Sequence, residues 1–234
     1  MDWDSVMVSH LNAEQRARLA SACVGLAGAG GLGSNCAVLL ARCGVGRLML
    51  VDFDVVSLSN LNRQNFLPEH VGRLKVEALA SMLHMINPQV RVETRAVRLE
   101  ATNAADMFRE CDPVVEAVDA AEIKKMLFER LTGAGKFVIS ASGMAGWGGP
   151  AMHCRPFGKQ AVVVGDGVHG VRQDLPVLAP RVMMAAAMQA DQVLAHILGP
   201  CPGMAEGALP LQTSPQGASC PPAGFGAEPQ KSFT

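Results

Sequence analysis

A glycine-rich turn between two apolar segments constrains the fold of this chain more than any other feature. The stretch "VGLAGAGGLGSNCAVLLARCGVGRLMLVDFD" begins at Val24 and ends at Asp54. Its composition predicts a strand at 23–27, a buried helix at 34–43 and a second buried strand at 47–51. Such a strand, glycine turn, helix and strand form a βαβ unit, which indicates an α/β protein with a parallel sheet.

The same alternation continues along the chain. Helices are expected at 14–20, 75–86, 104–109, 120–131 and 181–198, and strands at 90–94, 113–118, 137–140 and 162–164. The sequence therefore predicts an α/β fold of the Rossmann type, in which helices flank a mostly parallel sheet.

Length and composition bound the domain organisation. A chain of 234 residues, of which 49% are hydrophobic, suffices for one large α/β domain. We assign this domain to residues 1–199. The segment 200–234 is rich in proline and glycine and shows no periodicity, so we expect a disordered tail.

Charge and hydropathy exclude several classes of partner. The formal net charge is −1, so nothing favours nucleic acid as a partner. No apolar run reaches the about 18 residues that a membrane span needs. The start of the chain, "MDWDSVMVSH", lacks the basic and then apolar order of a signal peptide. We therefore expect a cytoplasmic protein without membrane contact.

The seven cysteines are odd in number and form no C-x-x-C pair. A disulfide framework or a four-cysteine zinc site is therefore not expected. Cys23, Cys36 and Cys43 fall on predicted core elements, where we expect them to serve in packing. Cys154 is the best remaining candidate for a nucleophile, because it stands near basic residues in "MHCRPFGK".

The glycine turn predicts a nucleotide site. "GAGGLG" places Gly28, Gly30 and Gly33 in a G-x-G-x-x-G pattern before a helix, and the free N–H groups of a helix N-terminus attract phosphate. Asp52 follows about 20 residues later, at the end of the second strand, where a carboxylate accepts ribose hydroxyls. An adenine nucleotide is therefore the expected ligand, although a tight turn without a ligand remains the simpler alternative.

The connector after the second strand narrows the choice of nucleotide. "SNLNRQ" and "GRLK" supply Asn60, Arg63, Gln64 and Lys75, which should lie near the carboxyl ends of the strands. Two cations exceed what a pyrophosphate needs when backbone N–H groups already hold it. They suit a triphosphate that an anion attacks.

The segment from Gly28 to Lys75 closely resembles the ThiF/MoeB/HesA family, which is related to the ubiquitin-activating enzymes. "GAGGLG", "DFD", "SNLNRQ", "G-x-x-K" and "VEAVDAAEIK" stand in the family's order and approximate spacing. The resemblance extends over about 23–198, and "ASGMAGWG", "VVVGD" and "APRV" are similar to the short, zinc-free ThiF group.

The resemblance implies a function and a site. The family adenylylates the C-terminal carboxylate of a small ubiquitin-like protein that ends in Gly-Gly, and ThiS in thiamine biosynthesis is the carrier implied here. The cofactors implied are ATP and Mg²⁺, without zinc, in a homodimer. The residues implied are Gly31 and its neighbours for the nucleotide, Asp52 for the ribose, Asn60, Arg63 and Lys75 for the phosphates, and Asp119 for Mg²⁺.

The chemistry needs no general base, since a peptide carboxylate is already ionised at neutral pH with a pKa of about 3.5. His70 and His169 are accordingly expected on the surface. Where the family has an N-terminal "R-Y-x-R-Q", this chain has "EQRARL". Arg16 or Arg18 is the available substitute, but the simpler interpretation is a solvated helix face.

Two other functions stay open on the sequence alone. An NAD-dependent oxidoreductase explains "GAGGLG" and Asp52 but gives no role to Arg63, Gln64, Lys75 or Asp119. A degenerate module that holds the carrier protein without catalysis is the third possibility, and the intact set of charged residues weighs against it.

Overall fold

A computed structural model describes residues 3–170 and 174–201. A seven-stranded sheet lies at its centre, with the strand order β3-β2-β1-β4-β5-β7-β6. The strands are β1 (Cys23–Ala27), β2 (Arg47–Val51), β3 (Arg91–Arg95), β4 (Val114–Glu116), β5 (Val138–Ala141), β6 (His153–Phe157) and β7 (Ala161–Gly165). All neighbouring strands are parallel except β6 and β7, which pair antiparallel.

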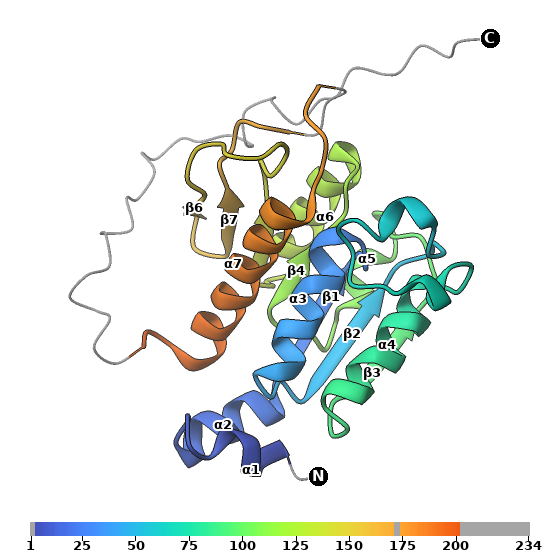
Figure 1. Ribbon diagram of the computed structural model, residues 1–234. Helices are drawn as coiled ribbons and strands as arrows, with labels where there is room; N and C mark the ends of the chain where they lie inside the picture. Colours follow the sequence, from blue (N-terminus) through green and yellow to red (C-terminus); the bar gives the residue numbers. More distant parts are fainter. Residues whose placement is uncertain (1–2, 171–173, 202–234) are drawn as a thin grey trace.

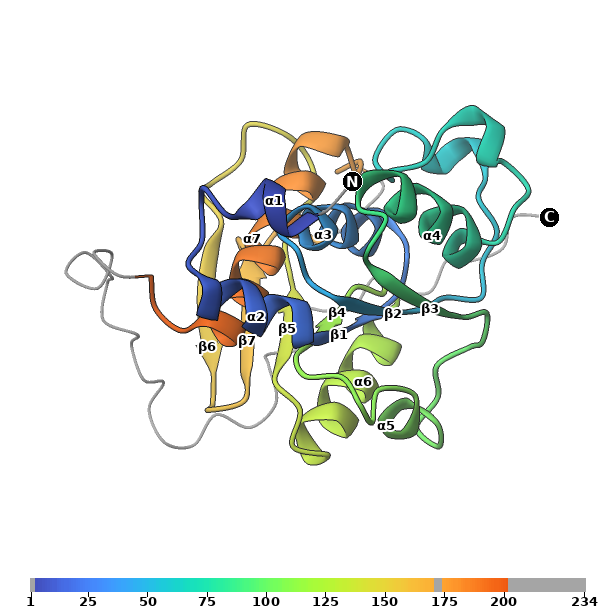
Figure 2. The same ribbon diagram turned by 90° about the horizontal axis from the view of Figure 1, so that it is seen from below.

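Helices cover both faces of the sheet, as Figures 1 and 2 show: α3, α4 and α7 lie on one face, and α5 and α6 on the other. The helices are α1 (Trp3–Met7), α2 (Ala13–Ser21), α3 (Gly31–Arg42), α4 (Lys75–Ile86), α5 (Ala104–Met107), α6 (Ala121–Gly133) and α7 (Ala179–Leu198), and short 3-10 turns occupy η1 (Leu58–Asn60) and η2 (Pro68–His70). The expected Rossmann-like sheet flanked by helices is confirmed. Within the described ranges, no helix is long and apolar enough to cross a membrane.

The core consists of two apolar layers, one on each face of the sheet. Leu26, Leu48 and Leu50 belong to the larger layer under α3, α4 and α7. Met49 and Val138 belong to the layer under α5 and α6. Because both faces of β1 and β2 are covered, their sequences are continuous apolar runs without polar alternation.

The strand order reverses next to β1, which positions the site. The chain proceeds from β1 to β2 and β3 on one side, and β4 then pairs with the other side of β1. Ligands of open α/β sheets bind outside the carboxyl ends of the strands at such a reversal. The glycine turn after β1 and Asp119 after β4 therefore meet at the same edge.

The structure departs from the expected elements mainly as follows, besides shifts of a few residues at the ends of other elements. Strand β6 was not expected, because it is an edge strand with polar, half-exposed residues and Pro156. Helix α1 is also additional. Helix α3 begins at Gly31 instead of Ser34, so the last glycines of the turn belong to its first turn. The expected disordered tail is 200–234; its residues 202–234 lie outside the described residues, and the disorder stays a prediction.

Candidate functional site

Close packing explains why the turn after β1 consists of glycines. Gly28 has a φ of +104°, and a Cβ there would lie 2.7 Å from the carbonyl oxygen of Ala117. A Cβ on Gly33 would lie 1.9 Å from the carbonyl oxygen of Gly28. By contrast, the nearest atom to a Cβ on Gly30 would be Gln64 Nε2, at 3.8 Å. The turn thus packs closely against the end of β4 and the start of α3. At Gly30, by contrast, the space that a side chain would occupy is open.

Asp52, one residue beyond β2, is hydrogen-bonded to the glycine turn. The backbone N–H of Ala29 donates to Asp52 Oδ2 at 2.7 Å, and that of Asp54 donates to Oδ1 at 2.8 Å. Burial raises the pKa of Asp52 above its ordinary value, against these two hydrogen bonds and the charge of Lys75. This carboxylate is held next to the turn, as a ribose-binding group requires.

Asp54 and Lys75 form an ion pair beside Asp52. Lys75 Nζ lies 2.7 Å from Asp54 Oδ2, and Lys75 N donates to Asp54 O at 2.9 Å. The lysine side chain is buried, whereas that of Asp54 is half exposed. Lys75 therefore lies at the predicted edge with its charge balanced by Asp54. Sequence reasoning missed Asp54, although the second aspartate of "DFD" was a visible signal.

Three predicted residues lie in the connector between β2 and α4. The side chain of Asn60 accepts a hydrogen bond from Ser57 N at 3.1 Å and shapes the turn. The partly buried Arg63 donates to Ser59 O at 2.9 Å and to Asn62 Oδ1 at 2.8 Å. Gln64 is buried, and its Oε1 has no partner among the described residues. Arg63 also approaches Gly31, since its Cγ would lie 3.7 Å from a Cβ there.

Asp119 is exposed in the turn between β4 and α6. The N-cap of α6 is Ala120, without a side-chain hydrogen bond, so Asp119 does not cap this helix. No hydrogen bond or ion pair within the described residues involves its carboxylate. The register of β4 against β1 pairs Glu116 with Ala27 and places Asp119 beside the glycine turn.

A buried polar cluster lies beneath Asp119, and sequence reasoning missed it. Lys124 Nζ donates to both oxygens of the fully buried Glu116 carboxylate, at 2.9 and 2.7 Å. Ser140 Oγ and the Val118 N–H also donate to this carboxylate, at 2.6 and 3.0 Å. Gln189 Nε2 of α7 donates to the Glu116 backbone oxygen at 3.0 Å. The cluster fixes both ends of the turn that carries Asp119.

The expectation that His70 lies on the surface is wrong. Only 3% of His70 is exposed, and its Nδ1 accepts a hydrogen bond from Leu67 N at 3.0 Å. The buried ring thus stabilises the short 3-10 turn η2. His169 is partly exposed, and its Nδ1 lies 3.0 Å from the buried carboxylate of Asp166. Asp166 also accepts a hydrogen bond from Arg181 NH2 at 2.6 Å. Among the residues that the structure describes, neither histidine makes a hydrogen bond or ion pair with the glycine turn or with Asp52.

The N-terminal arginines and the cysteines depart partly from expectation. Arg16 is half-buried and donates to Leu11 O at 2.8 Å, so it does not lie on a solvated face. Arg18 is exposed and donates to Leu198 O at 3.1 Å. Cys36 is buried as expected, whereas Cys23 and Cys43 are only partly buried and line a cavity at the opposite edge of the sheet. Cys154 is exposed on β6, and burial of its thiol and the charge of Asp191 raise its pKa.

No three His, Cys, Asp or Glu side chains come together as a metal site in the part of the chain that the structure describes. A cation at the predicted edge would accordingly need ligands from the bound molecule in addition to Asp119. The glycine turn, the Asp52 carboxylate and the Asp54–Lys75 pair lie together at this edge, and the aliphatic part of Arg63 approaches Gly31. Backbone N–H groups and cationic side chains near the start of a helix suit an anionic ligand.

Comparison with known proteins agrees with this geometry. The model of the ThiF family matches residues 4–216. The Candida glabrata protein "Adenylyltransferase and sulfurtransferase UBA4" is 33% identical over 194 residues, which make up 78% of this chain and 44% of that protein. The Drosophila persimilis "Ubiquitin-like modifier-activating enzyme 5" is 41% identical over 108 residues, or 43% of this chain and 28% of that protein. The chain thus spans less than half the length of these relatives.

Solved structures share the fold. The Escherichia coli tRNA N6-threonylcarbamoyladenosine dehydratase TcdA in complex with AMP superposes with a TM-score of 0.74 at 20% identity, over 82% of this chain and 92% of that one. Escherichia coli MccB with ATP superposes with a TM-score of 0.60 at 22% identity, over 78% of this chain and 57% of that one.

Proposed function

The chain belongs to the ThiF family, and from this membership we propose that it is an ATP-dependent adenylyltransferase of the cytoplasm. Its substrate is the C-terminal carboxylate of a ubiquitin-like carrier protein that ends in Gly-Gly. The observation that carries the proposal is the position of Lys75, paired with Asp54 at 2.7 Å beside Asp52. A buried cation at this place has a use in triphosphate chemistry and none in hydride transfer from NAD.

The glycine turn and Asp52 hold the nucleotide in this proposal. The free N–H groups at the start of α3 bind phosphate oxygens, and Asp52 accepts the ribose hydroxyls. The unpartnered Oε1 of Gln64 is available to a hydroxyl donor of the ligand. The solved complexes of TcdA with AMP and of MccB with ATP support an adenine nucleotide here.

The reaction is an attack of one anion on another, so charge neutralisation is the main requirement. The carrier carboxylate attacks the α-phosphorus, and the bond to pyrophosphate breaks. Lys75 and Arg63 stabilise the charge that develops on the phosphate oxygens and on the leaving pyrophosphate. Asn60 supports Arg63 by shaping the turn that carries it. No general base is needed.

Asp119 would hold Mg²⁺ together with oxygens of the triphosphate. Its carboxylate is exposed beside the glycine turn and has no partner in the described part of the chain, which fits this role, since Mg²⁺ commonly takes one or two carboxylates plus phosphate oxygens. The ion would supply charge neutralisation on the phosphates. The described residues offer no further carboxylate cluster for it.

For the carrier, we propose a ThiS-like protein of thiamine biosynthesis, with the enzyme acting as a homodimer. The names of the two relatives, a ubiquitin-like modifier-activating enzyme and an adenylyltransferase with sulfurtransferase activity, support a carrier of this class. TcdA is a tRNA N6-threonylcarbamoyladenosine dehydratase, and it raises the alternative of an RNA substrate. The net charge of −1 argues against that alternative, because RNA binding rests on basic surfaces.

Mass spectrometry of the carrier tests this proposal. The enzyme is incubated with Mg·ATP and a ThiS-type carrier, and in parallel with the same carrier lacking its last glycine. We expect an adenylyl adduct on the intact carrier only. Equal adducts on both carriers, or ATP consumption that depends on tRNA and not on the carrier, would overturn it.

A further inference from the structure

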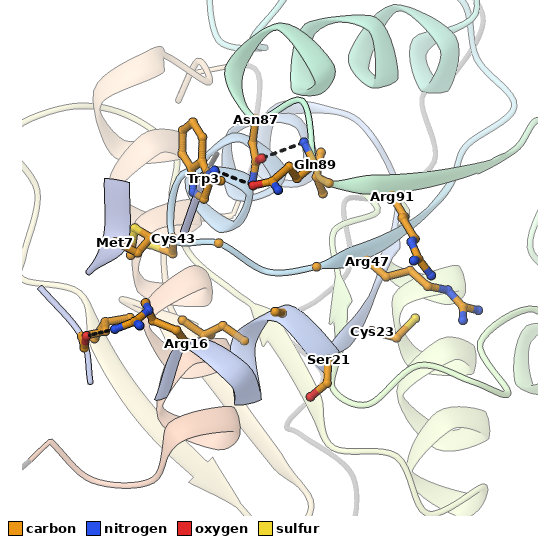
Figure 3. A pocket seen from close by; sticks show the side chains of 16 residues that line it. Trp3, Met7, Arg16, Ser21, Cys23, Cys43, Arg47, Asn87, Gln89 and Arg91 are labelled. Carbon is orange, nitrogen blue, oxygen red and sulfur yellow. Dashed lines mark hydrogen bonds between the residues drawn. The ribbon is translucent and has the colours of Figure 1, made fainter. Parts of the chain in front are cut away.

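A cavity of about 430 Å³ lies at the amino ends of β1, β2 and β3, at the edge opposite to the proposed nucleotide site. Helices α1 and α2 and the turns before β2 and β3 surround it. Its volume falls in the range of about 300–1,000 Å³ that small-molecule sites have. Among the described residues that line it are Arg16, Arg47 and Arg91, and no Asp or Glu. Figure 3 shows Cys23, Arg47 and Arg91 on one side of this cavity.

Two thiols meet at the edge of this cavity. Cys23 begins β1 and is partly exposed, whereas Cys111 is fully buried and precedes β4. Their sulfur atoms lie 3.3 Å apart although 88 positions separate them in the sequence. The backbone brings them together, since Asp112 N donates to Cys23 O at 3.0 Å and Gly25 N to Pro113 O at 3.1 Å. A sulfur–sulfur contact of this length brings the two thiols close enough for a disulfide to form after a small approach, since an S–S bond is about 2.05 Å long.

The surroundings make the two thiols unequal. The hydrogen bond between the two thiols is the main cause that lowers the pKa of Cys23, and the charge of Arg47 lowers it further against the effect of burial. The same contact and burial raise the pKa of Cys111. Arg47 is aligned with Cys23 across β1 and β2 and also pairs with Glu93 and Glu110. Cys23, which is partly exposed and lines the cavity beside Arg47, is therefore the thiol that a reagent reaches first, and the buried Cys111 is placed to resolve the adduct.

We propose that Cys23 and Cys111 form a redox-active dithiol, which an anionic low-molecular-weight disulfide oxidises to an intramolecular disulfide after entering the arginine-lined cavity. The Cys23 thiolate attacks one sulfur of the small disulfide and forms a mixed disulfide, and a small thiolate leaves. Cys111 then attacks the Cys23 sulfur, and its proton passes to the second leaving thiolate. Two electrons move from the protein to the small disulfide, which becomes two thiols.

The protein disulfide joins β1 and β4, the two strands whose other ends carry the glycine turn and the turn with Asp119. Excess small thiol reverses the reaction. A reducing compartment would therefore keep the site mostly as the dithiol, and the disulfide would form when the pool of small thiols becomes oxidised. This inference does not depend on the proposed adenylylation.

The test treats the full-length protein with glutathione disulfide and maps its cysteines by peptide mass spectrometry. We expect a Cys23–Cys111 disulfide in the wild type, formed faster than adducts on the exposed Cys154. In Cys111→Ser, the mixed disulfide on Cys23 accumulates because the resolving thiol is absent. Cys43→Ser, which removes another thiol of the same cavity, leaves the Cys23–Cys111 disulfide unchanged. The cationic disulfide cystamine reacts at least severalfold more slowly at Cys23 if the arginines select an anionic reagent.

Three results would overturn the proposal: no Cys23 adduct in Cys111→Ser, oxidation at Cys154 before Cys23, or disulfides that join two chains on a non-reducing gel. Cys111→Ala serves as a second variant beside Cys111→Ser, in case the buried hydroxyl perturbs the core. Thermal unfolding confirms that each variant is folded before it is oxidised.

Discussion

Lys75 Nζ and Asp54 Oδ2 lie 2.7 Å apart at the edge of the sheet that carries the glycine turn. The lysine begins α4, and the aspartate follows Asp52 by two residues, so one ion pair joins two elements of the predicted phosphate site. A buried ammonium group that is held in this way is preorganised for phosphate oxygens.

Lys75→Met tests the role of this lysine in the transition state. The substitution retains the length of the buried side chain and removes its charge. The rate at which the enzyme exchanges labelled pyrophosphate into ATP should therefore fall by about 10²–10³-fold. Lys125→Met, an exposed lysine on α6, is the matched control and should retain activity. Steady-state exchange assays at saturating ATP measure both. Activity of Lys75→Met close to that of the wild type would mean that Lys75 does not contact the phosphates.

Asp119→Asn separates a metal ligand from a structural residue. Because Ala120 and not Asp119 is the N-cap of α6, the melting temperature should barely change. The proposed loss of a Mg²⁺ ligand should reduce exchange strongly and raise the Mg²⁺ concentration that half-saturates it. Glu122→Gln, an exposed acid in the first turn of the same helix, is the control. An active Asp119→Asn enzyme with unaltered Mg²⁺ dependence contradicts the assignment.

Lys124→Met should destabilise the fold by about 3–5 kcal/mol, because it leaves the buried Glu116 carboxylate without its cation. The double variant Glu116→Gln/Lys124→Met removes both charges and should regain much of that loss. Urea unfolding of the two variants and the wild type gives the comparison. Equal stability of Lys124→Met and the wild type would mean that the pair is not formed.

The Asp166 carboxylate makes stability depend on pH. Burial, the largest single influence, raises its pKa, but hydrogen bonds from the His169 and Val168 amides and from the His169 ring together lower it below 3.8. A carboxyl group whose pKa is lowered in the folded state stabilises the fold at pH values above the pKa of the unfolded chain. This stabilisation is lost as the pH falls through the lower pKa of the folded state.

Asp166→Asn should therefore be less stable than the wild type at neutral pH, by about 3–5 kcal/mol, since Arg181 remains buried without a counter-charge. The difference should shrink below pH 3.8. Asp106→Asn breaks the exposed pair with Arg109 and should cost about 0–1 kcal/mol at either pH. Denaturant titrations at several pH values provide the measurement. If the difference in stability between Asp166→Asn and the wild type did not change with pH, the charge of Asp166 would not be its cause.

Local signals made much of the fold predictable. The strands 23–27 and 47–51 and the helix 75–86 agree with the structure residue for residue, because apolar runs and the Asn87-Pro88 stop define them in the sequence. Strand β6 escaped prediction, since an edge strand has one neighbour and carries polar residues and a proline. Its partner β7 alone defines its register.

Contacts between distant residues could not be predicted. Ser140 of β5 and Gln189 of α7 complete the cluster around Glu116. No local pattern in the sequence predicts either contact. The burial of His70 also escaped prediction, because its ring closes a turn that the sequence presents as a polar connector. The 3.3 Å approach of Cys23 to Cys111 follows from the pairing of β1 with β4, which spacing in the sequence does not reveal.

Exchange of labelled pyrophosphate into ATP tests the central claim most directly, because only reversible adenylylation produces it. The wild-type enzyme with Mg²⁺ and a carrier that ends in Gly-Gly should catalyse exchange, and omission of the carrier should abolish it. Parallel thermal melts should show a larger increase in melting temperature with Mg·ATP than with NAD. A ligand that binds only the native state raises the free energy of unfolding by RT ln(1 + [L]/Kd). No exchange with any Gly-Gly carrier, together with a larger shift by NAD, would contradict the account.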